Sequence, residues 1–124
     1  MRKSVALLFA ALLLVSVSAI AGENGVRPTG KLTRVETRMV CMINEHAMGK
    51  EQIPIEIEGR TYYGCCDMCK KALAADATKR SAVDPVSGKQ VDKATAVIAA
   101  QEDGRVFYFE DEASLAKYNK QFEK

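Results

Sequence analysis

A five-residue pattern that begins at Gly59 occurs again from Gly104. This repetition limits the possible folds of the chain more than any other feature. Residues 59–63 read Gly-Arg-Thr-Tyr-Tyr and residues 104–108 read Gly-Arg-Val-Phe-Tyr, at an interval of 45 residues. Self-similarity at a fixed interval predicts two copies of one supersecondary unit. A unit of about 40 residues is only marginally stable alone. We therefore expect an α+β fold in which two β-hairpin–helix units pack as one compact domain.

In the first unit, isoleucines alternate with other residues over residues 53–57, which predicts a half-buried strand. Pro54 stands near the start of this strand, where a missing amide donor is tolerated. Residues 58–60 are typical of a turn, and residues 61–63 of a returning strand. Residues from Asp67 to about Ala77 are rich in Ala, Lys and Leu and are expected to form a short helix. Asp67 near its start complements the helix dipole.

The second unit has the same predicted order. Residues 95–98 form a strand, residues 102–105 a turn and residues 106–109 the returning strand. A helix follows from Asp111 to about Phe122, and its apolar face is formed by Leu115, Tyr118 and Phe122.

Residues 1–21 have the parts of a secretory signal peptide. A basic start precedes a 13-residue apolar run at residues 5–17, and Ala-Ile-Ala at residues 19–21 fits a cleavage site. The run is too short for a transmembrane helix. We expect cleavage after Ala21 and export to the periplasm or out of the cell. Residues 22–38 are expected to form an extended, partly ordered leader, so regular structure should begin near Met39.

The predicted mature chain has no excess charge. Loss of Arg2 and Lys3 reduces Lys+Arg from 18 to 16, which equals the 16 Asp+Glu residues. Binding of nucleic acid requires clustered positive charge, so nucleic acid is not an expected partner. After cleavage of residues 1–21 we expect no association with a membrane.

Soft metal-binding residues are concentrated in a 31-residue window, residues 39–69. It contains all four cysteines, the single histidine and the four methionines that remain after signal cleavage. Thiolate ligands select Cu(I) and Zn(II) over hard cations, and nearby thioethers favour Cu(I). The composition of the window therefore predicts binding of a heavy-metal ion, with copper first and zinc second.

The spacing of three cysteines supports this prediction. Cys65 and Cys69 flank the expected junction between strand and helix, with three residues between them. At a helix N-terminus, the dipole and the free N–H groups favour the thiolate form, which is the metal ligand. Cys41 approaches from the loop before the hairpin. We therefore predict that Cys41, Cys65 and Cys69 bind the ion.

Cys66 and His46 are further candidate ligands. Cys66 is either a fourth ligand, a redox thiol or a small buried residue, and a bridge to adjacent Cys65 would be strained. His46 either completes a tetrahedral site or is a solvated loop residue. Met68 is expected to pack in the core, whereas Met42 and Met48 would matter mainly for Cu(I).

The second unit has lost these ligands. When the two copies are aligned by the repeat, Cys65 matches Glu110 and Cys69 matches Ser114; a shift of one residue matches Cys41 to Ser87. The second unit is therefore expected to be structural or to provide a docking surface.

These motifs resemble those of a known family. Cys41, the run Tyr-Tyr-Gly-Cys-Cys at residues 62–66 and Cys69 followed by Lys resemble the TRASH domain, which is proposed for heavy-metal trafficking, resistance and sensing. The stretch Asp-Pro-Val-Ser-Gly at residues 84–88 resembles the opening of the related YHS domain, with Ser87 in place of a cysteine.

The resemblance covers roughly residues 39–122. It implies a treble-clef-like metal module at residues 39–78, with Cys41, Cys65 and Cys69 at the ligand positions of the family, and a degenerate YHS-like unit at residues 79–124. It also implies that a metal-receiving or metal-exporting protein is a partner.

Two other functions remain open. Cys66-Asp67-Met68-Cys69 is a C-x-x-C motif that a thiol–disulfide oxidoreductase would use at the start of a helix. An even number of cysteines in an exported chain is also typical of a disulfide-stapled structural domain. No base stands next to an evident nucleophile, so we expect a metal-binding protein rather than an enzyme.

Overall fold

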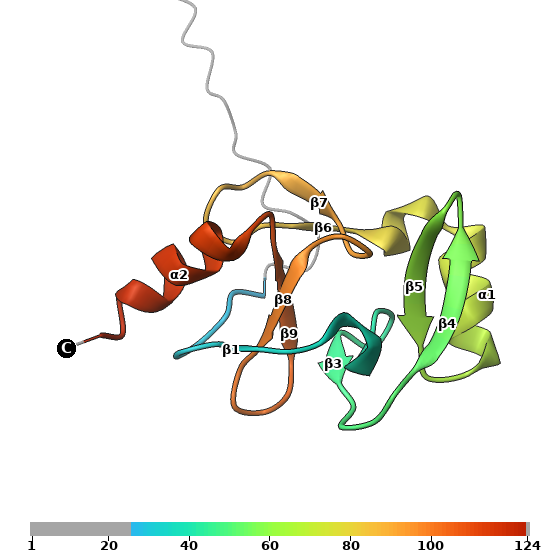
Figure 1. Ribbon diagram of the computed structural model, residues 1–124, viewed down its shortest axis with the longest axis horizontal. Helices are drawn as coiled ribbons and strands as arrows, with labels where there is room; N and C mark the ends of the chain where they lie inside the picture. Colours follow the sequence, from blue (N-terminus) through green and yellow to red (C-terminus); the bar gives the residue numbers. More distant parts are fainter. Residues whose placement is uncertain (1–25, 124) are drawn as a thin grey trace, which may run out of the picture.

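The computed structural model describes residues 26–123, and its main elements are two antiparallel hairpins that are each followed by a short helix (Figure 1). The first set comprises β4 (Ile53–Ile57), β5 (Arg60–Gly64) and α1 (Asp67–Ala75). The second comprises β8 (Val97–Ala100), β9 (Val106–Phe109) and α2 (Glu112–Lys120). The chain is thus a small mixed α+β protein. The expected signal peptide lies outside the described residues.

Smaller elements precede each main hairpin. Before β4 the chain forms β1 (Thr33–Arg34), the 3₁₀ helix η1 (Thr37–Met39), and the short hairpin of β2 (Val40–Cys41) and β3 (His46–Ala47). Between α1 and β8 it forms the 3₁₀ helix η2 (Ala77–Arg80), and the hairpin of β6 (Ser81–Val83) and β7 (Gln90–Asp92). Each unit therefore has a small hairpin, a main hairpin and a helix, in that order.

The main hairpins confirm the alternating patterns in the sequence. β4 and β5 pair from Ile53 opposite Gly64 to Ile57 opposite Arg60, which leaves a two-residue turn. Both turn residues have positive φ, 52° for Glu58 and 77° for Gly59, as expected for the tight turn that matches the twist of a hairpin. Ile55 faces the core, whereas Ile53 lies at the open end of the strand and is partly exposed.

The strand expected at residues 95–98 begins two residues later, at Val97. Asp92 explains the shift, because its carboxylate accepts a hydrogen bond from the backbone of Ala94 and its carbonyl accepts one from Ala96. These bonds hold residues 93–96 in a turn. The two helices likewise end about two residues before the expected ends at residues 77 and 122.

The expectation that regular structure begins near Met39 is wrong. β1 pairs with β8 and adds a third strand to the β8–β9 sheet. Leu32 is 2% exposed in the core, and the side chain of Asn119 on α2 bonds both the N–H and the carbonyl of Leu32. A single leucine has no periodicity, so the local sequence does not predict this strand.

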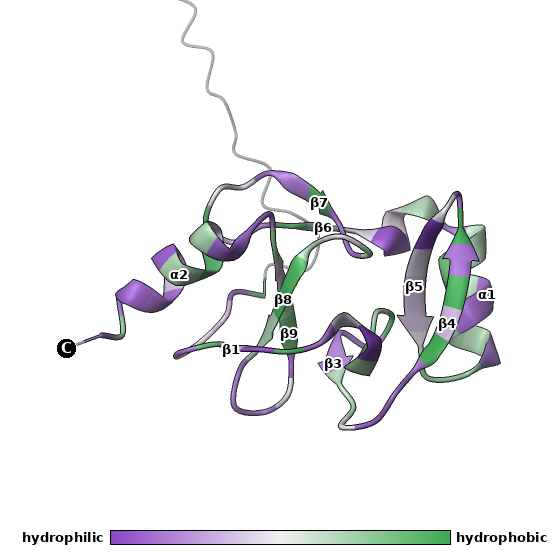
Figure 2. Ribbon diagram, in the orientation of Figure 1, coloured by the Kyte–Doolittle hydropathy of each residue, from purple (hydrophilic) through white to green (hydrophobic). Residues whose placement is uncertain are grey.

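The core connects the two units. One cluster of buried side chains contains residues of both, namely Val40, Met42, Ile55, Tyr62, Leu73, Ala96, Ile98, Val106 and Tyr108. A second cluster lies under α2. In Figure 2, hydrophobic residues occupy most of β8 and β9, hydrophobic and hydrophilic residues both occur along β4, and the two helices mix both kinds. The shared cluster supports the expectation that neither unit buries its apolar surface alone.

Candidate metal centre

The structure brings Cys41, Cys65 and Cys69 together. Their three sulfur atoms lie within 4.8 Å of one another. The Sγ atom of Cys69 is 3.8 Å from that of Cys41 and 3.5 Å from that of Cys65. A disulfide joins its sulfurs at about 2.05 Å, so these atoms are too far apart to be bonded to each other.

The observed spacing is compatible with three sulfurs that share one ion. Zn–S bonds of about 2.3 Å at tetrahedral angles place ligand sulfurs about 3.8 Å apart. The measured distances of 3.5 and 3.8 Å are close to this value. The three thiols are therefore arranged as a group that can hold a metal ion.

Three elements contribute the sulfurs. Cys41 lies in β2, Cys65 in the link between β5 and α1, and Cys69 in the first turn of α1. Cys41 is 0% exposed and Cys69 is 7% exposed, whereas Cys65 is only half-buried. The cluster thus has a buried side toward the core and an accessible side near the start of α1.

Gly64 allows β5 and α1 to approach each other at the site. A Cβ atom at this position would lie 2.8 Å from the Cβ atom of Cys69, closer than real side chains come. Sequence reasoning did not single out Gly64. Its place between a strand and a cysteine pair was the only indication, because glycine in a strand often marks a close approach.

Asn44 is the second residue that the sequence did not identify. Its backbone N–H donates to the Sγ atom of Cys41 at 3.4 Å, and its side-chain amide donates to the Sγ atom of Cys65 at 3.4 Å. Asn44 lies in the turn between β2 and β3, so this turn orients two of the three sulfurs.

The four thiols differ in acidity. Burial alone would raise the pKa of Cys41, but backbone N–H donors from Asn44, Ile43 and Cys65 act in the opposite direction and lower it overall. Burial, reinforced by neighbouring thiols, raises the pKa of Cys69 to about 12. A bound cation would replace the Cys69 proton and remove this cost, since metal ligation requires the thiolate.

Cys66 lies beside the three-sulfur group rather than inside it. It is exposed, and its Sγ atom is 3.6 Å from that of Cys69. The residue occupies the N-cap position of α1, where backbone and side-chain hydrogen bonds involving Cys69 lower the pKa of the Cys66 thiol. Of the roles left open by the sequence, that of a small buried residue is excluded.

His46 does not join the sulfurs. Its Nε2 atom lies 2.9 Å from the backbone carbonyl oxygen of Asp103, in the turn between β8 and β9. The hypothesis that His46 completes a tetrahedral site is therefore not supported. The ring instead packs against Gly104, where a Cβ atom would lie 3.0 Å from it.

This contact is part of a longer connection between the units. The N–H of Ala47 donates to the carbonyl of Gly104 at 2.9 Å, and the N–H of Val106 donates to the carbonyl of Glu45 at 2.9 Å. The ammonium of Lys93 donates to the carbonyl of Met42 at 2.9 Å. The second unit therefore holds the loop that follows Cys41.

The methionines also differ from expectation. Met68 was expected to pack in the core, but it is 80% exposed on the first turn of α1. Met42 is fully buried in the shared cluster, so its thioether belongs to the core. Met68 stays outside the core because Cys69 and Leu73 form the buried face of α1.

The second unit corrects the alignment of Cys41. The small hairpins match when Val40 opposite Ala47 is placed on Val83 opposite Gln90, and this register puts Cys41 on Asp84 rather than on Ser87. The turns agree as well, since Glu45 and Gly88 both have positive φ. The sequence alignment was wrong because the stretch from the small hairpin to the end of the main hairpin is two residues longer in the second unit.

In the second unit, hydrogen bonds to Asp84 stand in the place of the sulfur centre. Its buried carboxylate accepts from the N–H groups of Val86 at 2.7 Å, Ser87 at 3.1 Å and Glu110 at 2.8 Å, and from the hydroxyl of Ser114 at 2.6 Å. Glu110 and Ser114 are the counterparts of Cys65 and Cys69. One carboxylate thus links the same three positions that the thiols occupy in the first unit.

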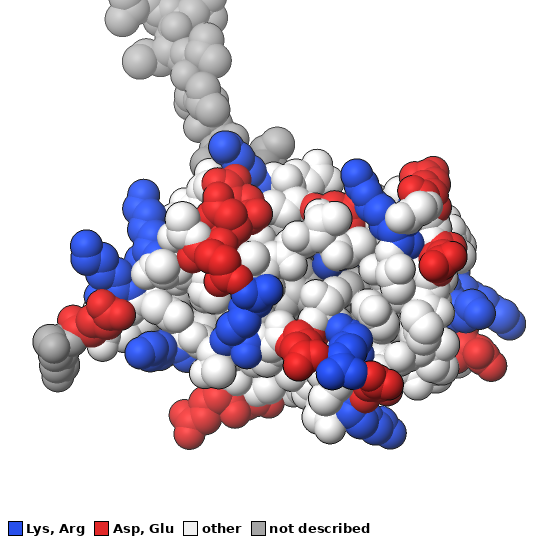
Figure 3. All heavy atoms as spheres, in the orientation of Figure 1, with Lys and Arg blue, Asp and Glu red and all other residues white. Residues whose placement is uncertain are grey.

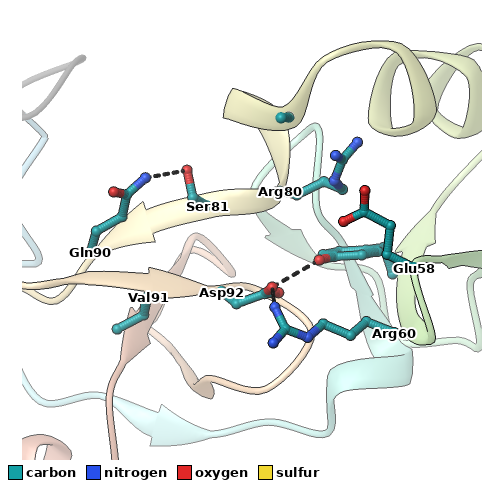
Figure 4. A pocket seen from close by; sticks show the side chains of 9 residues that line it. Glu58, Arg60, Arg80, Ser81, Gln90, Val91 and Asp92 are labelled. Atoms are coloured by element: carbon teal, nitrogen blue, oxygen red, sulfur yellow. Dashed lines mark hydrogen bonds and ion pairs between the residues drawn. The ribbon is translucent and has the colours of Figure 1, made fainter.

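A surface pocket of about 350 Å³ lies away from the cysteines, between β5, η2 and β7 (Figure 4). Two of its charged side chains pair with each other. Arg60 forms an ion pair with Asp92, and the hydroxyl of Tyr62 donates to the same carboxylate at 2.9 Å. Arg80 donates to the carbonyl of Leu73 at 2.6 Å. The pocket therefore lies where the two units meet, and the charged side chains of Glu58 and Arg80 also line it.

Charges of both signs alternate over the face shown in Figure 3. Within residues 26–123, no helix is long and apolar enough to cross a membrane. Comparisons of the chain with protein-family models, with curated proteins and with solved structures give no match. The assignment of function therefore depends on the site.

Proposed function

We propose that this chain is an exported metal-binding protein that captures, buffers or delivers a soft heavy-metal ion through Cys41, Cys65 and Cys69. One observation carries the proposal: the three sulfurs lie within 4.8 Å of one another, at distances suited to a shared ion. Export to the periplasm or out of the cell, inferred from residues 1–21, supports it. Thiols in an oxidising compartment tend to form disulfides unless something such as a metal protects them.

Copper is the first choice for the ion. Structural zinc sites have four protein ligands, and His46, the expected nitrogen ligand, is held by Asp103 instead. Three thiolates are sufficient for Cu(I), which accepts three-coordinate sulfur sites and prefers soft ligands. Zinc is the second choice, because it requires a fourth ligand such as Cys66.

The family proposal is a TRASH-like, treble-clef-like module at residues 39–78 and a degenerate YHS-like unit at residues 79–124. The matching order of small hairpin, main hairpin and helix in the two units supports it. In this proposal a metal-receiving or metal-exporting protein is the partner, and the chain is not an enzyme.

Anaerobic native mass spectrometry tests the function directly. The mature chain is titrated with Cu(I) and with Zn(II), and free thiols are counted in parallel. We expect one tightly bound ion per chain, with Cu(I) preferred, and a loss of about 10-fold or more in affinity for Cys69→Ser. Ser87→Ala, at an exposed position of the second unit, is the matched control and should bind like the unmodified chain. Full affinity in Cys69→Ser would contradict the proposed site.

A thiol–disulfide oxidoreductase is the second candidate. The observation that favours it is the pair of Cys66 and Cys69 at 3.6 Å, with the exposed thiol at the start of a helix. One labile disulfide and no bound ion in the same thiol count would support this candidate. Two stable disulfides would instead support a stapled structural domain.

A further inference from the structure

The cysteine sulfurs are arranged along a path from the core to the surface. Cys41 is 0% exposed and Cys69 is 7% exposed, so a second protein cannot reach either sulfur directly. Cys65 is half-buried, and Cys66 is exposed. Cys66 is the outermost of the four, and its sulfur is 3.6 Å from that of Cys69, a distance that one ion can bridge.

A second exposed soft donor follows this outer thiol in the chain. Met68 is 80% exposed on the first turn of α1, two residues after Cys66. An exposed methionine gains nothing from core packing, but its thioether is a weak ligand for Cu(I). The start of α1 therefore exposes a thiol and a thioether, both of which suit a soft ion.

Cys66 is also an unusual residue for its structural position. It is the N-cap of α1, but its sulfur makes no capping hydrogen bond of normal geometry and receives only a weak interaction from the N–H of Cys69. Its counterpart Asp111 has nearly the same backbone angles, and its carboxylate accepts a bond from the N–H of Ser114 at 2.8 Å. Asp or Ser is the favoured residue at an N-cap, so capping does not explain a cysteine here.

We propose that Cys66 is an exchange ligand that carries Cu(I) between the buried sulfurs and a soft donor on another molecule. This inference rests on the proposed function, because it requires that Cys41, Cys65 and Cys69 hold the ion at rest. Cys66 is then absent from the resting ligand set and binds only during loading and release.

The exchange changes ligands and leaves the oxidation state of copper unchanged. The Cys66 sulfur forms a bond to Cu(I), its thiol proton passes to solvent, and the bond from Cu(I) to the innermost sulfur, that of Cys41, breaks. Two thiolates of the acceptor then bind Cu(I) one after the other, as the bonds to Cys65, Cys66 and Cys69 break in turn. The four released thiolates, that of Cys41 included, take up protons from solvent. Loading follows the same steps in reverse.

Two measurements on the mature, Cu(I)-loaded chain test this role. Equilibrium competition with the chromophoric chelator bathocuproine disulfonate gives the affinity, and stopped-flow absorbance with excess chelator gives the transfer rate. The variants are Cys66→Ser and Cys66→Asp, which both supply a good N-cap and so preserve the start of α1. Cys69→Ser serves as the comparison for loss of a resident ligand.

We expect the affinity of both Cys66 variants to stay within about threefold of the unmodified chain, and the transfer rate to fall about tenfold or more. Met68→Leu keeps the side-chain size and should slow transfer less. An affinity loss as large as that of Cys69→Ser would overturn the inference by making Cys66 a resident ligand. An unchanged transfer rate would also overturn it. Failure of the unmodified chain to bind Cu(I) would instead refute the proposed function itself.

Discussion

Replacement of Asp84 by alanine tests whether a hydrogen-bonded carboxylate has taken over the structural role of the sulfur centre in the second unit. The side chain is 0% exposed and accepts four hydrogen bonds, three from backbone N–H groups and one from Ser114. These bonds connect the small hairpin, the end of β9 and the start of α2. We therefore expect Asp84→Ala to loosen the whole second unit.

The size of the destabilisation follows from the donor groups that lose their acceptor in Asp84→Ala. A buried donor left unpaired costs about 1–3 kcal/mol, and breaking a buried charged network costs about 3–5 kcal/mol in total. We expect Asp84→Ala to lower the free energy of unfolding by about 3–5 kcal/mol. The whole free energy of unfolding of a small domain is about 5–15 kcal/mol. Asp84→Asn keeps the size and one oxygen acceptor, so its loss should be smaller.

Urea unfolding followed by circular dichroism measures this loss, with the slope of the transition used to check two-state behaviour. Asp111→Ala is the matched control, because Asp111 is an exposed cap of the same helix and its loss should cost about 1 kcal/mol. If Asp84→Ala lowered stability no more than Asp111→Ala, the proposed replacement of the sulfur centre by a carboxylate would be refuted.

Two further predictions concern the pH dependence of Asp84 and the close approach of Gly64 to Cys69. Burial opposes ionisation of Asp84, but its four hydrogen bonds hold the pKa of the carboxyl group below the ordinary value. The ionised carboxylate therefore stabilises the fold above about pH 4. This stabilisation is lost as the pH falls through the folded-state pKa. The difference in urea midpoint between the unmodified chain and Asp84→Ala should therefore shrink as the pH falls from 5 to 2. All other carboxylates are common to the two proteins, so a constant difference would contradict this prediction. Gly64→Ala should displace Cys69, because the added Cβ atom meets that of Cys69 at 2.8 Å, and should lower Cu(I) affinity about tenfold or more in chelator competition. Gly59→Ala, at a φ of +77° with open space around it, is the control and should cost about 1–2 kcal/mol of stability without changing the affinity.

Local patterns in the sequence were sufficient for the main hairpins and the helices. Alternation over residues 53–57 predicted β4, and the helix after each hairpin was located to within about two residues of its observed end. These patterns succeed because strand and helix periodicity reflects contacts between residues that are near in the chain. The interval of 45 residues likewise predicted that α2 follows the same plan as α1.

The candidate site was only partly predictable. The spacing of Cys41, Cys65 and Cys69 indicated a shared centre, because a strand–helix junction brings two thiols together whatever surrounds it. The places of His46 and Met68 were not predictable in the same way. His46 is held by a turn 57 residues away, and Met68 is exposed because other residues of α1 supply the buried face.

The sequence alone thus determined the repeated β-hairpin–helix plan and the confinement of soft ligands to the first unit, since both depend on residue types at short spacings. The tertiary structure decided that Leu32 belongs to the core and that Asp84 matches Cys41. It also decided that Cys66 is the outermost thiol. Burial, strand pairing and exposure depend on which distant segments meet in space, and that information is spread over the whole chain.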